Sequence, residues 1–547
     1  NQSASGGVFI NMSTKSSATV NSCQFKAGHS QSNGGAILIN SGKISIFDSV
    51  FEDNISEGSG GAIEASNSVL EVRRSHFKNC TAEVGACIYA IQSDAEITDS
   101  KFTQSKAGAI NGNTSTLIIV ASTFSSNTGI RGGAIVCNSC TAVTIDTSSF
   151  LANSATAGGA IKLKGAGTET DLKFIISNCS FVGNSASLFG GAVVLESVNI
   201  DIVSSIFADN AALQDDGGAV YLRCPSKECK FALKDDSFLN NTALLEGGAI
   251  SWDQSEPLLQ NLYFQDNKAD YGNDVASYPV DVSLESKAAL KSQSYMQTVV
   301  SGNVIESAVK GVLTDHYNNP VLTDEDSSVE LYALEPSKVS ILGNSRTKVS
   351  RGSFEIEQIT ITSDPNSTVL LGLRCDSMSK VLEFEVYVRP CLVGEEQVGK
   401  ECKKCETGYF NLEAGKVCED CVTGARCYGG SLMAPLKGYW RSNNNTSDFF
   451  TCPWRKACEG GVDDFSEQGN CDSGYEGNMC QSCSKGYSRF SMDQCVKCPS
   501  PTVNKVVLVV LAIALLGVAS ALIAMTIKSA NKPKSLSSVY LKIMMNY

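Results

Sequence analysis

The chain has 547 residues, 22 of them cysteines, and a formal net charge of −13. That length exceeds what one ordinary hydrophobic core holds, so it predicts three or four domains. The negative charge repels phosphate backbones, and we expect no nucleic-acid partner. Because the chain has only three histidines, histidine-based chemistry has little material, and we expect no enzyme activity and no cofactor.

A repeat built around phenylalanine fills the first half of the chain. Its phenylalanines are Phe25, Phe51, Phe77, Phe102, Phe124, Phe150, Phe181, Phe207, Phe238 and Phe264. An aliphatic residue stands five positions before each of them, and a small residue, usually serine or cysteine, stands two before. Apolar residues at every second position predict strands with one buried face.

Corner signals follow each strand. Three positions after the phenylalanine, seven of ten repeats have asparagine, namely Asn54, Asn127, Asn153, Asn184, Asn210, Asn241 and Asn267. A Gly-Gly-Ala-aliphatic segment comes next, as at residues 34–37, 60–63 and 247–250. One repeat cannot bury its own apolar face, but coils stacked at about 4.8 Å bury each other's. We predict a parallel β-helix of about ten coils over residues 1–278, with the asparagines stacked in one row. A packed corner leaves no room for a glycan, so we expect Asn54 to stay unglycosylated despite its sequon.

These residues carry a resemblance. Gly-Gly-Ala-[Ile/Leu/Val] with Phe-x-x-Asn resembles the repeat pair of chlamydial polymorphic outer-membrane proteins, and it is similar to β-helix repeats in large surface proteins of single-celled eukaryotes. Over about residues 1–275 the resemblance implies a right-handed, pectin-lyase-like parallel β-helix and, as function, adhesion. Chlamydial relatives end in an outer-membrane β-barrel, whereas this chain ends in an apolar helix, so autotransport is not implied.

Residues 279–390 lack the repeat and are predicted to form a different domain. Short β-rich runs at 329–332, 354–361, 369–373 and 381–388 are separated by turn signals such as 318–320. This pattern favours a β-sandwich of immunoglobulin-like type.

Residues 391–500 are rich in cysteine and predict a disulfide-bonded stalk. They contain four C-x-x-C pairs and three C-x-x-G-Y segments, which resemble ephrin-receptor-like and EGF-like modules. Zinc ribbons are the alternative that the spacing leaves open, although the sequons and the nearby membrane span favour disulfides. The disulfide candidates are Cys224, Cys229, Cys402, Cys405, Cys418, Cys421, Cys427, Cys452, Cys458, Cys471, Cys480, Cys483, Cys495 and Cys498.

Other cysteines lie inside the β-helix repeat. Cys137 and Cys140 form either a disulfide or a pair of free buried thiols. Cys23 and Cys179 occupy the small-residue position six repeats apart, so they cannot pair with each other, and we expect both to be buried free thiols.

Residues 506–527 contain no charge and are long enough to cross a bilayer as a helix. More lysines follow this span than precede it, so the positive-inside rule predicts a cytoplasmic C-terminus, residues 528–547, and extracellular N-terminal domains at the plasma or another surface membrane. Because residue 1 falls almost on a Gly-Gly corner, we expect the chain to be a fragment of a larger membrane protein.

The site candidates are few. Neighbouring repeats place five acidic residues that could bind calcium or catalyse polysaccharide cleavage, although solvated loop acids are the simpler reading: Asp209, Asp215, Asp216, Asp235 and Asp236. The glycosylation candidates are Asn11, Asn113, Asn240, Asn366, Asn444 and Asn445.

The fold class is therefore all-β: a right-handed parallel β-helix, a β-sandwich-like domain, a disulfide-rich stalk and one transmembrane α-helix. The favoured function is a non-enzymatic, membrane-anchored scaffold, adhesin or assembly subunit, with protein partners and possibly glycans. A signalling-receptor ectodomain is the second hypothesis. A carbohydrate-binding or polysaccharide-lyase-like protein is the third, and as an enzyme it needs a cleft with paired carboxylates and a base.

Overall fold

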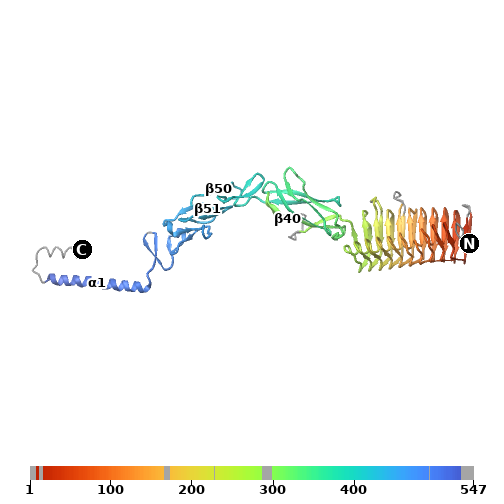
Figure 1. Cartoon of the computed structure of the whole chain (residues 1–547), viewed down its shortest axis with the longest axis horizontal. Coiled ribbons are helices and arrows are strands. Elements are labelled where there is room, and N and C mark those ends of the chain that lie inside the picture. Colours follow the sequence, from red (N-terminus) through yellow and green to blue (C-terminus); the bar gives the residue numbers. More distant parts are fainter. Residues whose placement is uncertain are drawn as a thin grey trace. The chain divides into compact units, whose positions relative to one another are not determined.

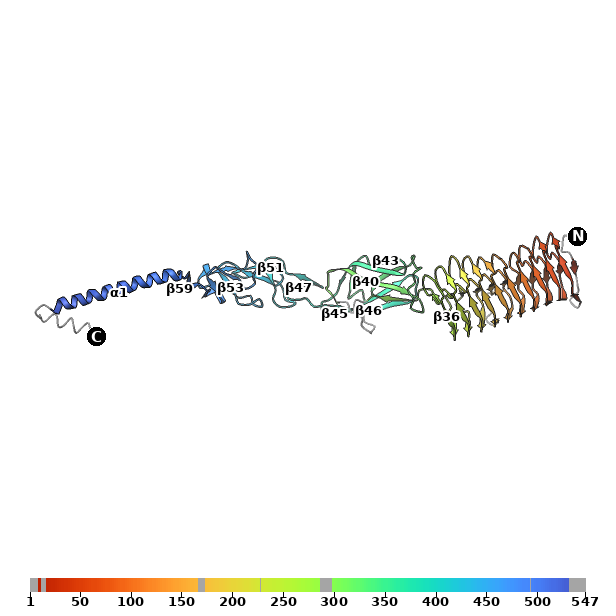
Figure 2. The ribbon, with the colours of Figure 1, turned by 90° about the horizontal axis from the view of Figure 1, so that it is seen from below.

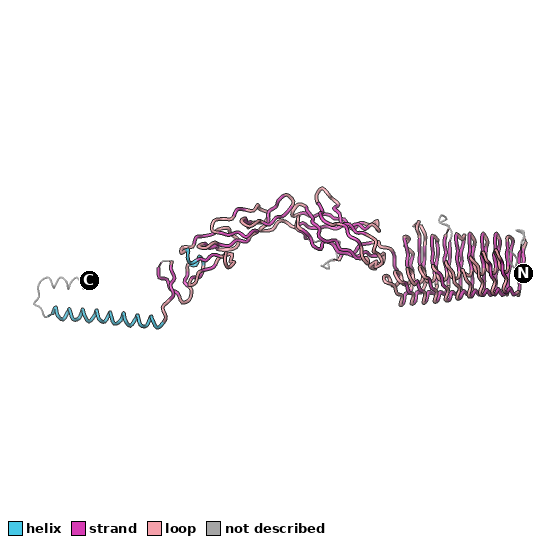
Figure 3. Tube along the Cα trace, viewed as in Figure 1, coloured by secondary structure: helices cyan, strands magenta, loops and turns pink. Residues whose placement is uncertain are grey.

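The computed structural model describes residues 8–10, 16–165, 173–226, 228–285, 298–491 and 493–530. They fall into two compact units, the first made of residues 1–297, 304–361 and 368–386, the second of 298–303, 362–367 and 387–547. Figure 1, Figure 2 and Figure 3 show the strands of the N-terminal half as a stack of coils and the C-terminal apolar segment as a helix. The predicted all-β fold with a parallel β-helix and one apolar helix is confirmed.

Three long parallel sheets form the walls of the β-helix. The Gly-Ala sheet contains β1 (Val8–Ile10), β5 (Ile37–Ile39), β9 (Ile63–Ser66), β12 (Ile88–Ile91), β15 (Ile110–Asn113), β18 (Ile135–Asn138), β22 (Ile161–Lys164), β26 (Val193–Glu196), β30 (Val220–Arg223), β34 (Ile250–Asp253) and β37 (Val275–Ser277). The aliphatic sheet contains β2 (Ser17–Asn21), β6 (Gly42–Phe47), β10 (Ser68–Arg73), β13 (Asp94–Thr98), β16 (Thr116–Val120), β19 (Ala142–Asp146), β23 (Lys173–Ser177), β27 (Asn199–Val203), β31 (Phe231–Lys234) and β35 (Leu258–Gln260). The Phe sheet contains β3 (Gln24–Lys26), β7 (Val50–Glu52), β11 (His76–Lys78), β14 (Lys101–Thr103), β17 (Thr123–Ser125), β20 (Ser149–Leu151), β24 (Ser180–Val182), β28 (Ile206–Ala208), β32 (Ser237–Leu239) and β36 (Tyr263–Gln265).

Shorter strands follow the Phe sheet at the asparagine corner. They pair as β4 (His29–Ser30) with β8 (Ile55–Ser56), and as the row β21 (Ser154–Ala155), β25 (Ser185–Ala186), β29 (Ala211–Ala212) and β33 (Thr242–Ala243).

The repeat phenylalanines form one continuous stack inside the coils. Neighbouring strands of the Phe sheet pair in register, phenylalanine opposite phenylalanine. Ring centroids of successive members lie 4.6 Å apart at the closest pair and 5.4 Å at the widest. From Phe51 to Phe238 every ring is fully buried, so these side chains are the largest shared component of the core.

The asparagine row exists as predicted. Asn153 Oδ1 accepts two hydrogen bonds from Asn127, one from its backbone N–H and one from its side-chain amide, each 3.0 Å long. Asn184, Asn210, Asn241 and Asn267 repeat this pattern. Each asparagine Nδ2 also donates to a phenylalanine carbonyl of the preceding coil, as Asn153 does to Phe124. Each amide therefore satisfies backbone groups that the corner would otherwise leave unpaired.

Asn54 belongs to the same row. It is fully buried, its Oδ1 accepts from the backbone N–H of Gly28, and its Nδ2 donates to the carbonyl of Phe25, both at 3.0 Å. That it stays unglycosylated remains a prediction.

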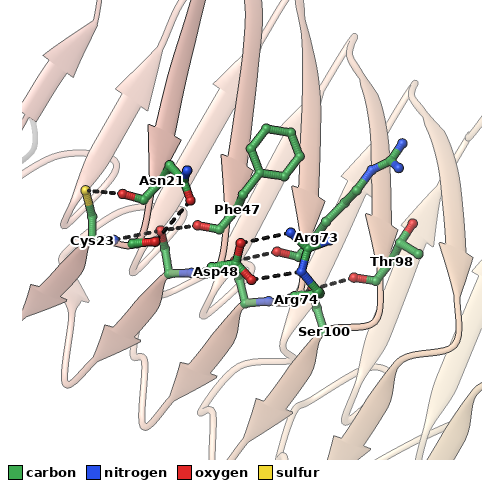
Figure 4. Close-up of polar contacts among 11 residues, drawn as sticks. Asn21, Cys23, Phe47, Asp48, Arg73, Arg74, Thr98 and Ser100 are labelled. Carbon is green, nitrogen blue, oxygen red and sulfur yellow. Dashed lines mark hydrogen bonds and ion pairs between the residues drawn. The ribbon is translucent and has the colours of Figure 1, made fainter.

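A second corner joins the aliphatic sheet to the Phe sheet (Figure 4). Its residues have positive φ, and their N–H groups donate to the next coil, as Asp48 does to Arg73 and Arg74 to Thr98. Arg74 also holds Asp48 through two 2.8 Å bonds.

Cys23 lies beside this second corner, and its thiol donates to the Asn21 carbonyl at 3.3 Å. It is exposed, contrary to our expectation, because β3 is the edge strand of the Phe sheet, whereas Cys179 lies deeper in the stack and is buried and free as predicted.

Two sheets follow the β-helix. The first contains β38 (Asp281–Leu284), β40 (Val304–Thr314), β44 (Ser353–Thr362) and β42 (Ser340–Gly343). The second contains β39 (Thr298–Val299), β46 (Val381–Val388), β45 (Ser367–Cys375), β41 (Ser328–Ala333) and β43 (Arg346–Lys348). Buried and exposed residues alternate along parts of β44 and β46, as in sheets with one buried face. This arrangement agrees with the predicted β-sandwich-like segment.

The stalk consists of seven two-stranded hairpins and two short 3-10 helices, η1 (Arg455–Ala457) and η2 (Asn478–Cys480). The hairpin strands are β47 (Glu395–Val398) with β48 (Glu401–Lys404), β49 (Tyr409–Phe410) with β50 (Glu419–Asp420), β51 (Ala425–Gly429) with β52 (Leu432–Pro435), β53 (Tyr439–Arg441) with β54 (Phe449–Thr451), β55 (Cys458–Gly460) with β56 (Asn470–Cys471), β57 (Tyr475–Glu476) with β58 (Ser482–Cys483), and β59 (Tyr487–Ser491) with β60 (Gln494–Lys497).

Disulfides cross-link these hairpins. They link Cys391–Cys402, Cys405–Cys418, Cys421–Cys427, Cys452–Cys458, Cys471–Cys480 and Cys483–Cys495. No C-x-x-C pair of the stalk closes on itself, because each bond joins segments that the hairpins bring together. The β-helix adds Cys224–Cys229, as predicted, and Cys137–Cys140.

Cys498 was wrongly included among the disulfide candidates. It is free and exposed, since its neighbour Cys495 bonds to Cys483 instead. Cys391, which was not among the candidates, takes part in the first stalk disulfide.

The chain's apolar segment forms α1 (Pro501–Ala530). It is long and apolar enough to cross a membrane, and none of its most apolar stretch is buried against the rest of the protein. A helix whose leucine, isoleucine and valine side chains are not covered by the rest of the protein is stable only where an apolar medium surrounds it. The predicted membrane span therefore agrees with the structure.

The asparagine row yields the first prediction. Replacing Asn184 by alanine removes the acceptor of the Asn153 N–H and of one side-chain amide hydrogen of Asn153, and it removes the amide that donates to the Phe150 carbonyl. Each unsatisfied buried group costs about 1–3 kcal/mol, so we expect Asn184→Ala to lower the unfolding free energy by about 3 kcal/mol or more. Chemical denaturation measures it.

The matched control removes an exposed amide. Gln214→Ala should change the unfolding free energy by no more than about 0.5 kcal/mol. Equal losses in the two variants would show that the row adds nothing specific to stability.

Candidate functional site

The structure separates the five candidate aspartates into four places. Asp209 lies at the asparagine corner between β28 and β29, whereas Asp235 lies at the second corner between β31 and β32. Both are exposed with φ of 56°, and each accepts a hydrogen bond from the next coil, Asp209 from Asn240 at 2.6 Å and Asp235 from Asn261 at 3.2 Å. Each side chain therefore stabilises its own corner, as Asp48 does at the second corner.

Asp236 points inward at the small-residue position. It is fully buried, and its Oδ1 accepts from the backbone N–H of Ser205 at 2.7 Å. Burial raises its pKa to about 7. In other coils a serine hydroxyl takes this place and donates to the carbonyl two residues before it, as Ser205 does to Val203.

Asp215 and Asp216 precede the Gly-Gly turn at the other side of the coil, beside Glu246 of the next coil. Burial raises the pKa of Asp216 to about 9, and the nearby charges of Glu246 and Asp215 add to this shift. Burial also raises the pKa of Glu246, which accepts hydrogen bonds from the Tyr271 hydroxyl and, at 2.9 Å, from Ser251. We call Asp215, Asp216 and Glu246 the acidic corner.

Burial in the acidic corner favours the protonated, neutral carboxyl group over the carboxylate. No salt bridge reaches it from the part of the chain that the structure describes, and the same residues hold no group of three or more His, Cys, Asp or Glu side chains placed to bind a metal ion. The five aspartates therefore do not form one cluster, because successive corners of a coil point in different directions. Asp209 and Asp235 agree with the interpretation as solvated loop acids, whereas Asp236 is buried.

The outer face of the Phe sheet was not among the sites predicted from the sequence. The residues immediately before and after each repeat phenylalanine point outward, since side chains alternate along a strand. Parallel in-register pairing then arranges them in two columns that run from coil to coil.

In the first four coils these columns are charged. Lys26 and Lys78 both contact Glu52, at 3.0 Å and 3.2 Å. Burial lowers the pKa of His76, and the nearby ammonium groups of Lys101 and Lys78 lower it further. Beside these coils a shallow hollow of about 520 Å³ is lined by Glu52, Asp53, Lys78, Asn79, Gln104, Ser105, Lys106, Ser126 and Thr128.

In the last five coils the same columns carry no charge. The apolar ones are Leu151, Val182, Ile206, Ala208, Leu239 and Tyr263, which we call the apolar flank. Tyr263 is 56% exposed and Ile206 is 47% exposed. The sequence contains the signal for this surface, because aligning the repeats on phenylalanine shows charge ending after Lys101.

The glycosylation candidates differ in accessibility. Asn240, Asn366, Asn444 and Asn445 are exposed, Asn113 is half-buried, and Asn11 lies outside the described residues. The Nδ2 of Asn240 is engaged with Asp209, so attachment of a glycan there requires that contact to open.

Two known families match parts of the chain. The Chlamydia polymorphic membrane protein repeat matches residues 48–66, and a domain of unknown function, DUF7630, matches residues 449–498. The first match confirms the repeat resemblance. Ephrin-receptor-like and EGF-like modules in the stalk remain predictions.

One curated relative is receptor-like. The chain is 30% identical over 168 residues to metabotropic glutamate receptor-like protein R of Dictyostelium discoideum, a match that covers 29% of this chain and 10% of the relative. The chain thus spans only a small part of that relative's length. No solved structure matches the chain.

The acidic corner yields the second prediction. The Asp216 carboxyl is neutral when folded up to about pH 9 but ionises above 3.8 when unfolded. Stability from this group is therefore fully present below the lower value and falls as pH rises toward the higher one. We expect Asp216→Asn to flatten the loss of stability between about pH 5 and about pH 8 by about 1 kcal/mol or more.

Urea denaturation at the two pH values measures this slope. Gln214→Ala, which removes an exposed uncharged side chain of the same coil, should keep the slope of the unsubstituted chain. Identical slopes in the unsubstituted chain and Asp216→Asn would contradict the raised pKa.

Proposed function

We propose that this chain is the extracellular part of a membrane-anchored, non-enzymatic surface protein that binds a protein partner through the apolar flank. The observation that carries the proposal is the loss of charge along the outer face of the Phe sheet, where leucine, isoleucine and tyrosine are exposed beside serine. Depletion of charge with exposed aliphatic and aromatic side chains is typical of the centre of protein interfaces.

The geometry of the β-helix supports this use. The backbone hydrogen bonds of each coil continue into the next coil, so the two columns form a regular and rigid surface. A partner then meets a surface that needs little ordering on binding, which favours affinity. Contiguous exposed apolar side chains on a soluble domain commonly mark an interaction site.

The stalk and α1 support a surface location. Six short-range disulfides fit an oxidising compartment, and α1 is suited to a bilayer. Lysines 528, 532, 534 and 542 follow the span, whereas only Lys497 and Lys505 lie just before it. The positive-inside rule then places the domains before α1 outside the cell. The disulfide-linked hairpins would act as a spacer between the membrane and the β-helix.

Two observations favour second candidates. The relative in Dictyostelium is receptor-like by its name, which supports a receptor ectodomain in which partner binding is the input signal. The hollow beside the charged coils is lined by amides, hydroxyls, two lysines and the carboxylates of Glu52 and Asp53, groups that suit the hydroxyls of a glycan.

The third prediction concerns the apolar flank. Introducing two carboxylates by Ile206→Glu and Tyr263→Glu should reduce binding of the surface partner at least about tenfold, because a charge must then be desolvated in the interface. The measurement compares the proteins cross-linked to the chain at the surface of its own cells, quantified by mass spectrometry.

The matched control is Thr123→Glu with Ser125→Glu, outward positions of the same sheet on the uncharged coil before the apolar flank. It should keep the cross-linked partner, and thermal melting should show both variants folded. Equal recovery of every partner with the two folded variants would overturn the proposal.

A further inference from the structure

The coil that begins at Phe77 carries two cysteines at positions where the other coils have other residues. Cys80 stands three residues after the phenylalanine, where seven coils have asparagine. Cys87 stands where the neighbouring coils have the alanine of the Gly-Gly-Ala segment, Ala62 and Ala109, with which it shares backbone hydrogen bonds. No other coil has cysteine at either position.

These two positions face each other across the interior of a coil. The last coil shows this independently, because Asn267 and Asp274 occupy the same two positions and their side chains are hydrogen-bonded at 3.1 Å. The paired departures at Cys80 and Cys87 therefore fall on side chains that the fold places in contact.

The two thiols are indeed in contact. Each is fully buried. The hydrogen bond that the Cys80 thiol makes with Cys87, together with burial, holds the pKa of Cys80 well above its usual value. Cys87 Sγ also lies 2.8 Å from Ser105 Oγ. Ser105 occupies the asparagine-row position of the following coil, where it replaces asparagine. The asparagine row is thus interrupted at Cys80 and Ser105, between Asn54 and Asn127.

We propose that Cys80 and Cys87 form a disulfide in the mature protein, which replaces the interrupted asparagine corner by a covalent tie. The two thiols lose two protons and two electrons as the sulfur–sulfur bond forms. The oxidant is the disulfide of a dithiol oxidoreductase of the secretory pathway, which is reduced to its dithiol by exchange. This exchange occurs during folding, before the neighbouring coils bury the sulfurs.

The bond lies directly behind the charged part of the Phe sheet. Lys78 and Asn79, which precede Cys80, and Ser105, which contacts Cys87, all line the hollow. The covalent tie fixes the corner that carries these side chains where no asparagine does so. The inference rests on the proposed extracellular location, because cytosolic thiols stay reduced.

Peptide mapping of the full chain purified from its own cells tests this inference. The protein is denatured in an alkylating reagent without reductant, deglycosylated and digested with trypsin. Peptide 79–101 contains both cysteines and no other. We expect it to be lighter than the reduced peptide by two hydrogen atoms and free of alkyl groups. After reduction it should take up two alkyl groups.

The outcomes separate the two proposals. Cys137–Cys140 and Cys224–Cys229 are the internal references. If those pairs are oxidised while peptide 79–101 carries two alkyl groups before reduction, the Cys80–Cys87 disulfide is overturned and the location stands. If the reference pairs are also reduced, the extracellular location fails, and with it the basis of the disulfide.

Variants identify the partner of each cysteine. In Cys87→Ala, Cys80 should take up one alkyl group without reduction, whereas an unreactive Cys80 would reveal another partner and overturn the pairing. Cys80→Asn with Cys87→Ala restores the residues of the other coils, so this variant should fold and melt as a β-helix without the bond. Cys179→Ser, which removes a lone buried thiol, should leave peptide 79–101 oxidised.

Discussion

In-register stacking of parallel coils is the constraint on which the rest of the structure depends. The backbone N–H and carbonyl groups of each coil form hydrogen bonds with the next coil. The next coil also buries the apolar side chains that would otherwise be exposed at the end of the stack. The same type of side chain must therefore return at the same place in every coil. Phenylalanine rings stack on phenylalanine rings, and asparagine amides bridge to asparagine amides. Most coils have glycine where they approach the next coil closely, as at Gly61. A Cβ added at Gly61 would lie 2.2 Å from the carbonyl oxygen of Ala86.

Stacking constrains the side chains that point into the coil, whereas the side chains on the outer face are free to vary. Lys78 and Leu239 occupy equivalent places beside a buried phenylalanine, yet one lies in a charged network and the other in the apolar flank. Function can therefore change along the β-helix without changing its fold. A substitution that alters the interior has to be matched inside the same coil, and Cys80 and Cys87 are such a pair.

The difference between a constrained interior and a variable outer face also explains which features could be predicted from the sequence. The Phe sheet, the asparagine row and the buried state of Asn54 follow from repeat period and residue type, because every coil reports the same environment. Cys498 was misassigned because pairing in the stalk depends on which hairpin segments meet, and C-x-x-C spacing does not encode that. Asp215 and Asp236 were grouped by nearness in sequence, although the path of the chain places them at different sides of the coil. Cys23 looked equivalent to Cys179 until its edge position was seen.

Amide hydrogen exchange across residues 16–277 tests the central claim, that the coils are tied in register through interior rows. The backbone N–H groups of Asn127, Asn153, Asn184, Asn210 and Asn241 each donate to the asparagine Oδ1 of the next coil. They should exchange as slowly as the amides of the flanking strands and in one cooperative unit. Fast exchange at these five amides, with slow exchange in the strands beside them, would contradict the account.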